Sequence, residues 1–228
     1  MRGARGTGRL DVAARAILFD LDGTLADTAM DLAAALNRLL GERGLDPVSP
    51  ELARPHTSSG ARGLLRIGFG LTPGDPDYAA LRERFLELYG ESLCVDTKLY
   101  EGIPELLLHL ESRSVPWGIV TNKSARFTEP LLELLGLRRR AACVVSGDTT
   151  GKIKPAPDPL LRAAADLGIA AADCLYIGDD LRDIQAARSA NMGAIAAGWG
   201  YLGANGAPAT WGADGVAERP EQVLRYLA

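Results

Sequence analysis

The chain has 228 residues, of which 47% are hydrophobic and 24% charged, and its net charge is −4. This length and balance predict one soluble globular unit with a modest insertion, and the acidic net charge argues against nucleic acid as a partner. Two histidines are too few for a His-rich zinc site. Three scattered cysteines without a CxxC pair exclude a disulfide scaffold and predict free thiols in a reducing cytoplasm.

Neither the N-terminal residues nor the longest uncharged stretch predicts a membrane or export segment. Residues 1–15 contain arginines but no apolar run of the kind that a secretory signal needs, and we expect them to form a flexible leader. Residues 189–213 carry no charge, but six glycines and Pro208 interrupt them, so they do not predict a spanning helix. The sequence therefore predicts a cytoplasmic protein without a membrane partner.

Short apolar runs alternate with longer helical patterns from residue 16 onwards. The runs that we expect to form strands are Ala16–Phe19, Pro116–Val120, Cys143–Val145, Cys174–Ile177, Ala194–Ala197 and Ala213–Val216. This alternation predicts βαβ units around a parallel sheet, that is, a doubly wound α/β fold. The first four runs are followed directly by small, polar or acidic residues, and open α/β sheets bind ligands at the carboxyl ends of their strands.

One interval, from Asp27 to about Lys98, lacks a convincing strand. It contains only helical stretches, at Thr28–Arg43, Pro50–Arg54, Arg62–Ile67 and Pro76–Leu93. The interval is too long for a βα connection, whose loops usually span about 2–6 residues. We therefore expect an inserted α-helical cap over residues 28–97 and an α/β core formed by residues 16–27 and 98–228.

The first predicted strand runs directly into two carboxylates, Asp20 and Asp22. Their i, i+2 spacing allows both to approach the same side of the strand end, where Gly23 permits a turn and Thr24 adds a hydroxyl and main-chain N–H groups. Two carboxylates at one site suit a hard cation such as Mg²⁺, and the pair can also divide the roles of nucleophile and acid/base. An EF-hand loop is excluded because its sixth position requires glycine and holds Leu25 here.

Side chains with catalytic chemistry also follow three later strands. Thr121 and Asn122 offer a hydroxyl and an amide for hydrogen bonds, although Thr-Asn is also a common turn or helix N-cap. A lysine can neutralise negative charge that develops in a reaction, and Lys152 and Lys154 are both candidates after the third strand. Asp179 follows the fourth strand and a glycine, and it is the candidate to complete a metal site.

The segment Asp20–Asp27, with the sequence DLDGTLAD, resembles the first motif of the haloacid dehalogenase superfamily. Members of that superfamily are mostly Mg²⁺-dependent phosphatases with a Rossmann-like core. Three further motifs of the superfamily occur in order: Thr121-Asn122, a lysine before Pro155, and Gly178–Asp183. The superfamily pattern places the lysine immediately before proline, which favours Lys154 over Lys152.

The resemblance implies a role for each motif residue. Asp20 is expected to attack phosphorus and form an aspartyl-phosphate, while Asp22 protonates the leaving oxygen and then activates water. Mg²⁺ is expected to be held by the Asp20 carboxylate, the Asp22 main-chain carbonyl and Asp179. Many members carry Ser or Thr where this chain has Asp180, so the parts played by Asp180 and Asp183 stay open. The residues expected to bind the substrate's phosphate are Thr121, the Asn122 main chain, Lys154, Gly23 and Thr24.

Two glycine-rich motifs favour other ligands only weakly. Gly198–Gly203 matches the G-x-G-x-x-G pattern, but no helix is predicted to open there, so we do not expect a dinucleotide site. Gly147–Lys152 is one residue short of a phosphate-binding P-loop and is followed by Ile153 in place of Ser or Thr.

Three other functions use a strand-end aspartate. A phospho-acceptor signalling module needs neither a cap nor the second acid, Asp22. A dehalogenase of the same superfamily lacks that second acid, because it has no leaving group to protonate. A phosphomutase is harder to exclude, and turnover with water as the acceptor is the discriminating assay.

From Ile17 onwards the chain resembles the phosphoglycolate phosphatase-like branch and, within it, bacterial phosphatases that act on N-acetylmuramic acid 6-phosphate in cell-wall recycling. Both substrates combine a phosphate with a carboxylate, and Arg62 is the candidate residue to bind that carboxylate. The alternative interpretation is that Arg62 is only an exposed arginine at the start of a helix. We expect the amino-sugar phosphate, with 2-phosphoglycolate as the alternative. The enzyme is expected to act on this small molecule as a monomer or homodimer. The shared stretches are Trp117-Gly118, Val120–Lys123, Arg126-Phe127, Glu129-Pro130, Gly178–Ile184 and Trp211–Asp214.

Overall fold

The structure is a computed structural model and describes residues 14–203 and 205–227. Of the predicted leader, residues 1–13 lie outside this described part. Arg15 immediately precedes the first strand, and its main-chain N–H donates a 2.7 Å hydrogen bond to the carbonyl of Asp173.

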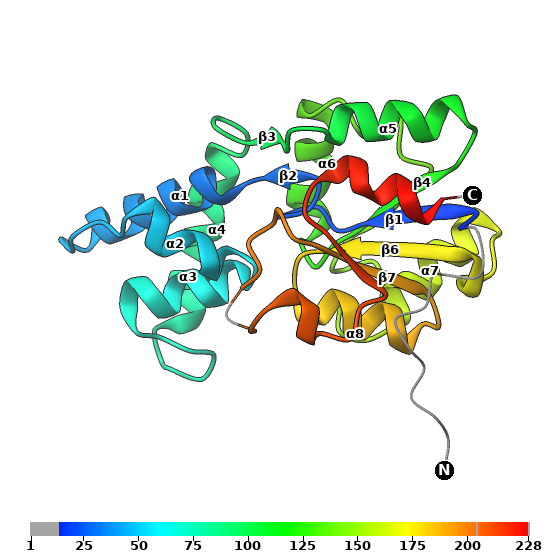
Figure 1. Ribbon diagram of the computed structural model, residues 1–228. Coiled ribbons are helices and arrows are strands. Elements are labelled where there is room, and N and C mark those ends of the chain that lie inside the picture. The colour runs from blue at the N-terminus through cyan, green and yellow to red at the C-terminus, as the bar shows by residue number, and fades with distance from the viewer. Residues whose placement is uncertain (1–13, 204, 228) are drawn as a thin grey trace, which may run out of the picture.

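Six strands form one sheet in the order β5-β4-β1-β6-β7-β8 (Figure 1). All five neighbouring pairs are parallel, which confirms the predicted doubly wound α/β fold. The last strand begins at Gly215, later than expected. Asp214, just before it, exchanges two hydrogen bonds with the main chain of Ala194, through its main-chain N–H at 2.8 Å and through its carboxylate at 2.9 Å. The bounds are β1 Ala16–Phe19, β4 Trp117–Val120, β5 Cys143–Val145, β6 Cys174–Gly178, β7 Gly193–Ala197 and β8 Gly215–Ala217.

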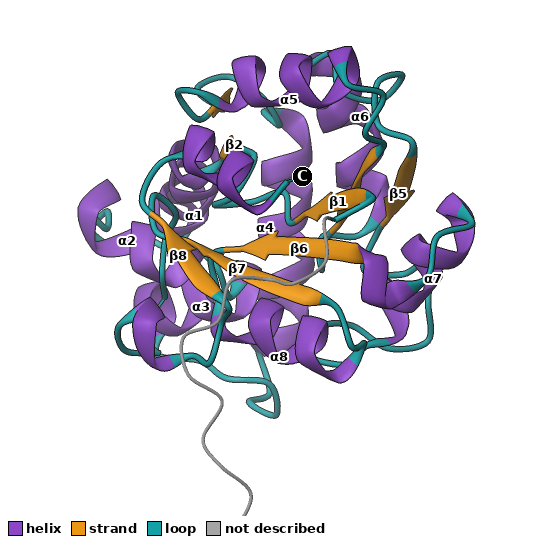
Figure 2. Cartoon of the chain, turned by 45° about the vertical axis from the view of Figure 1, so that its right-hand side comes forward, coloured by secondary structure: helices purple, strands orange, loops and turns teal. Residues whose placement is uncertain are grey.

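Helices cover both faces of the sheet, as Figure 2 shows. Successive side chains of a strand point to opposite faces, so one strand contributes to two buried cores. Phe19 packs in the core that includes α5 and α6. Leu18 and Tyr176 pack in the core that includes α7 and α8. The bounds of these helices are α5 Ile103–Ser112, α6 Ala125–Leu134, α7 Asp158–Leu167 and α8 Leu181–Ser189.

Four further helices, which we call the cap, follow β1 and lie at the carboxyl-end side of the sheet, on the left in Figure 1. Their apolar faces pack together, and Leu36, Leu64 and Phe85 are fully buried there. None of the described helices is both long enough and apolar enough to cross a membrane. The cap helices are α1 Ala29–Glu42, α2 Pro50–Thr57, α3 Gly60–Phe69 and α4 Tyr78–Glu91.

Two short strands, which we call the hinge strands, join the cap to the core. β2 (Ala26–Asp27) pairs antiparallel with β3 (Lys98–Leu99), a pairing that the sequence analysis did not expect. Arg54 of the cap donates to the Asp27 carboxylate at 2.8 Å and to the Tyr100 hydroxyl at 3.2 Å. The chain therefore enters and leaves the cap at two adjacent positions, and a cap side chain binds at both.

Candidate active site

A cavity of about 360 Å³ lies between the carboxyl ends of the central strands and the cap. Its core wall comes from the ends of β1, β4 and β6, where the sheet's strand order reverses and α/β folds bind their ligands. Gly23 and Thr24 are adjacent to it but do not line it. Seven of the predicted site residues line the cavity: Asp20, Asp22, Arg62, Thr121, Asn122, Lys154 and Asp179.

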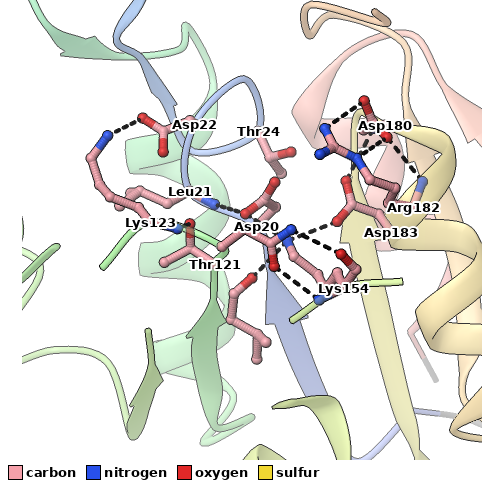
Figure 3. A network of polar contacts seen from close by, with 12 residues as sticks. Asp20, Leu21, Asp22, Thr24, Thr121, Lys123, Lys154, Asp180, Arg182 and Asp183 are labelled. Atoms are coloured by element: carbon pink, nitrogen blue, oxygen red, sulfur yellow. Dashed lines mark hydrogen bonds and ion pairs between the residues drawn. The ribbon is translucent and has the colours of Figure 1, made fainter. Parts of the chain in front are cut away.

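Asp20 and Lys154 form an ion pair at the bottom of the cavity (Figure 3). The Lys154 ammonium lies 2.8 Å from Asp20 Oδ1 and 2.8 Å from Asp183 Oδ1, and it is 2% exposed. A buried ammonium between two carboxylates has its charge compensated, which offsets the loss of hydration. Lys152 instead pairs at 3.3 Å with Asp158, which is more exposed than Asp20, and neither residue of this pair lines the cavity. Of Lys152 and Lys154, it is therefore Lys154 that reaches the strand ends.

The two carboxylates that pair with Lys154 form a cluster with a third one. Asp20, Asp179 and Asp183 each offer an oxygen, and these oxygens lie within 4.8 Å of one another. Burial raises the pKa of Asp20 to about 7, against the opposing charge of Lys154. Burial also raises the pKa of Asp179 well above its usual range, and the charges of Asp20 and Asp183 add to the effect. Such a cluster favours binding of protons or of a hard cation.

The surroundings of Asp179 fit a divalent cation bound by this cluster. Thr24 Oγ1 donates to Asp179 Oδ1 at 2.9 Å, and the Tyr201 main-chain N–H donates to Oδ2 at 2.9 Å. Two glycines let the carboxylate approach the main chain, since a Cβ at Gly23 or Gly200 would lie 2.2 Å from an Asp179 atom. Gly23 also has a φ of +85°, which only glycine adopts without cost. The assignment of Gly23 and Thr24 to substrate binding stays a prediction.

The glycine-rich segment after β7 therefore contributes to the site in a way that its sequence pattern did not predict. No helix opens at Gly198–Gly203, and the next described helical turn is Pro208–Thr210. The segment instead brings Gly200 and Tyr201 against Asp179. In the sequence, only the repeated glycines indicate that another group can approach the main chain of this segment closely. They do not indicate that this group is Asp179.

Asp22 lies outside the carboxylate cluster, and its side chain is held by two donors. Lys123 Nζ and Thr28 Oγ1 both donate to Asp22 Oδ1, at 2.8 and 2.6 Å. Lys123 also lies 4.8 Å from the ring centroid of Tyr89, a residue of α4 in the cap. Burial lowers the pKa of Lys123, but the contacts of its ammonium with Asp22 and Tyr89 together outweigh burial and raise that pKa above its ordinary value. The Asp22 main-chain carbonyl stays the predicted metal ligand.

Thr121 and Asn122 occupy the end of β4. The Thr121 hydroxyl accepts the main-chain N–H of Lys123 at 3.1 Å. The Asn122 side chain exchanges two hydrogen bonds with the main chain of Lys154, one of 3.0 Å and one of 2.9 Å. The Asn122 amide therefore positions Lys154, which leaves the Asn122 main chain as the predicted contact to phosphate.

The two acids left open by the sequence differ in position. Asp180 caps α8 by accepting the Arg182 N–H at 2.9 Å, and its carboxylate pairs with the Arg182 guanidinium. Asp183 accepts the Asp180 N–H at 3.0 Å and turns its other oxygen toward Lys154. Asp183 therefore belongs to the carboxylate cluster, whereas Asp180 holds Arg182, which donates to the carbonyl of Ser58 in the cap at 2.6 Å.

Comparison with known proteins identifies the family to which this site belongs. A model of the haloacid dehalogenase-like hydrolase family matches residues 17–197. The chain belongs to this family, as the motif order predicted, and within it the chain is a phosphatase of phosphomonoesters.

The similar proteins carry two different substrate names. The chain is 41% identical over 213 residues to the N-acetylmuramic acid 6-phosphate phosphatase of Pseudomonas aeruginosa, covering 93% of this chain and 94% of that one. It is 43% identical over 214 residues to a phosphoglycolate phosphatase of Xanthomonas campestris pv. campestris, covering 94% and 96%. The crystal structure of a predicted phosphoglycolate phosphatase from Haemophilus somnus superposes with a TM-score of 0.83 at 27% identity, covering 93% and 97%.

Proposed function

We propose that this phosphatase hydrolyses N-acetylmuramic acid 6-phosphate in the cytoplasm, as a monomer or homodimer. The observation that carries the choice of substrate is the cavity, whose volume of about 360 Å³ falls within the ~300–1,000 Å³ of sites that enclose drug-sized ligands. A sugar ring with two substituents suits such a volume, whereas a two-carbon acid fills only a small part of it.

The reaction that we propose has two steps. Asp20 attacks phosphorus and forms an aspartyl-phosphate, while Asp22 gives a proton to the sugar oxygen that leaves. Asp22 then takes a proton from water, whose oxygen attacks the same phosphorus and frees Asp20. Lys154, 2.8 Å from Asp20, neutralises part of the charge on the phosphoryl group in both steps.

The cofactor that we propose is Mg²⁺. Asp20, Asp179 and the Asp22 main-chain carbonyl would hold it, and the carboxylate cluster adds Asp183 as a further candidate. A bound Mg²⁺ would neutralise the phosphate and the buried carboxylates together. Thr24 and Tyr201 fix the Asp179 carboxylate, so this side chain does not have to reorganise when a cation binds.

The second candidate substrate is 2-phosphoglycolate, favoured by the Xanthomonas relative of that name. The deciding experiment measures kcat/KM for both substrates side by side, with Mg²⁺ present and phosphate release to water as the readout. We expect the amino-sugar phosphate to have the higher value. A higher value for 2-phosphoglycolate would overturn the choice of substrate, and transfer of the phosphate to a second sugar without release would indicate a mutase.

A further inference from the structure

The positive groups around the cavity divide into two kinds. Three come from the core, Lys123, Lys154 and Arg182, and each is paired with an aspartate of the site. The other two, Arg62 of α3 and Arg82 of α4, come from the cap, and neither forms an ion pair within the described part of the chain. The core cations are therefore neutralised by the protein, whereas the cap cations are available to a ligand.

The negative groups show the opposite distribution. Among the described residues, every acidic residue that lines the cavity belongs to the core, and the cap contributes none. The core contribution to the cavity lining is thus acidic and suited to a cation with a phosphate, while the cap contributes two guanidinium groups without an ion-pair partner among the described residues. These acidic residues are Asp20, Asp22, Asp179, Asp180 and Asp183.

Arg82 belongs to the face of α4 that turns toward the cavity. It precedes Phe85, Leu86 and Tyr89 at the spacing i, i+3, i+4 and i+7, which places all four on one side of a helix. All four line the cavity, and Tyr89 is 1% exposed. The α4 face therefore presents a cation beside an apolar and aromatic wall, which suits an anionic sugar.

We propose that Arg82 acts with Arg62 as a two-guanidinium anchor for a substrate carboxylate that lies several bonds from the phosphate. Guanidinium groups bind carboxylates through paired hydrogen bonds, and two of them from neighbouring helices add charge without a competing acid. Because the anchor lies in the cap, it selects a carboxylate across a sugar ring. A carboxylate two bonds from the ester oxygen would lie near Asp22 instead. This inference rests on the proposed function.

The test compares two substrates that differ by one carboxylate-bearing group. N-acetylmuramic acid 6-phosphate carries a lactyl ether that N-acetylglucosamine 6-phosphate lacks, while the phosphate, ring and acetamide are shared. We expect Arg82→Gln to lower kcat/KM for the muramic acid substrate, relative to that for the glucosamine substrate, about tenfold. This is the size expected for the loss of a hydrogen bond to a charged group, and it should appear as a higher KM for the muramic acid substrate. The matched control is Arg66→Gln, on an exposed arginine of α3 outside the cavity lining, which should leave the ratio unchanged.

An unchanged ratio in the Arg82→Gln enzyme, with an unaltered melting temperature, would overturn the inference. Failure of the wild-type enzyme to turn over the muramic acid substrate would instead overturn the proposed function. In that case the same variants are compared on 6-phosphogluconate and glucose 6-phosphate, a second pair that differs in a distal carboxylate. Equal losses on both members of that pair would also reject the anchor.

Discussion

The Lys123 ammonium and the Asp22 carboxylate form an ion pair of 2.8 Å in which the lysine is 8% exposed. Thr28 donates to the same carboxylate oxygen, so Oδ1 is fixed and Oδ2 has no hydrogen bond within the described residues. The free oxygen is therefore the one available to exchange a proton with the leaving group or with water. Orientation of an acid/base group of this kind contributes strongly to rate.

Replacement of Lys123 by methionine should impair the protonation of the leaving group. We expect kcat to fall about tenfold on a sugar phosphate, whose leaving oxygen needs a proton, and less on p-nitrophenyl phosphate, whose leaving group does not. Steady-state kinetics on the two substrates measures the difference. An equal loss on both would assign Lys123 to structure alone.

Asp20→Asn should abolish turnover and leave the fold intact. The amide matches the carboxylate in size but cannot act as the nucleophile, so we expect a loss of at least ~10³-fold in kcat. Phosphate release by the purified variant is the measurement, with the melting temperature as the control for folding. Near-normal release would contradict the covalent mechanism.

The raised pKa of Asp20 predicts a pH-dependent response to Mg²⁺. The folded value of about 7 exceeds the ordinary value of 3.8, so the folded state binds this proton more tightly than the unfolded state does. The contribution of this group to stability is therefore complete below pH 4 and is lost as the pH rises through 7. A bound cation should offset that loss, because it stabilises the ionised carboxylates.

We accordingly expect Mg²⁺ to raise the melting temperature more at pH 7.5 than at pH 5.5. Thermal unfolding with and without the ion, at both pH values, measures the two shifts. Asp179→Asn is the matched variant, and it should reduce the shift at pH 7.5. A shift of equal size at both pH values would contradict the proposed ion site.

Gly200→Ala should displace the Asp179 carboxylate. The added Cβ would lie 2.2 Å from Asp179 Cβ and 2.4 Å from the carbonyl oxygen of Gly23, and overpacking of this kind costs about 1–3 kcal/mol of stability. We expect the concentration of Mg²⁺ needed for half-maximal activity to rise at least about tenfold, a change of ~1.4 kcal/mol. Gly151→Ala, whose Cβ would meet nothing within 4 Å, is the control. Identical metal dependence in the two variants would exclude this role for Gly200.

Arg62→Gln should raise KM for the amino-sugar phosphate more than KM for p-nitrophenyl phosphate. Arg62 lines the cavity from the start of α3 in the cap, and it forms no ion pair with a described residue, so its loss should affect the carboxylate of a substrate. Initial rates over a range of both substrates give the two KM values. Equal changes would assign Arg62 to the surface of the cap.

The sequence was sufficient to predict the sheet and the strand-end motifs, because buried parallel strands are short apolar runs and the acids follow them directly. The hinge strands were missed because two residues, such as Ala26–Asp27, are too few to show a period. The end of α2 was placed too early because Pro55 usually ends a helix. The helix continues to Thr57, whose hydroxyl bonds to the carbonyl of Ala53 and whose side chain is buried.

The missed site residues have a different cause. Lys123 and Tyr89 meet only because the cap packs against the core, so their partnership is not visible in either segment alone. Arg82 lies on one face of α4 with Phe85 and Leu86, and their i, i+3, i+4 spacing identifies a helical face without saying what that face covers. Contacts between the cap and the core depend on how the two pack together, and the pattern of residues within one segment does not determine that packing.

The hinge strands mark the two points where the cap is joined to the core. The main chain leaves the core after Asp27 and returns at Lys98, directly opposite in the antiparallel pair. All six strands of the large sheet, including β1 and its partners β4 and β6, lie outside residues 28–97. A chimera that exchanges residues 28–97 would therefore keep every strand of that sheet in its own sequence, while the cap side of the cavity would change.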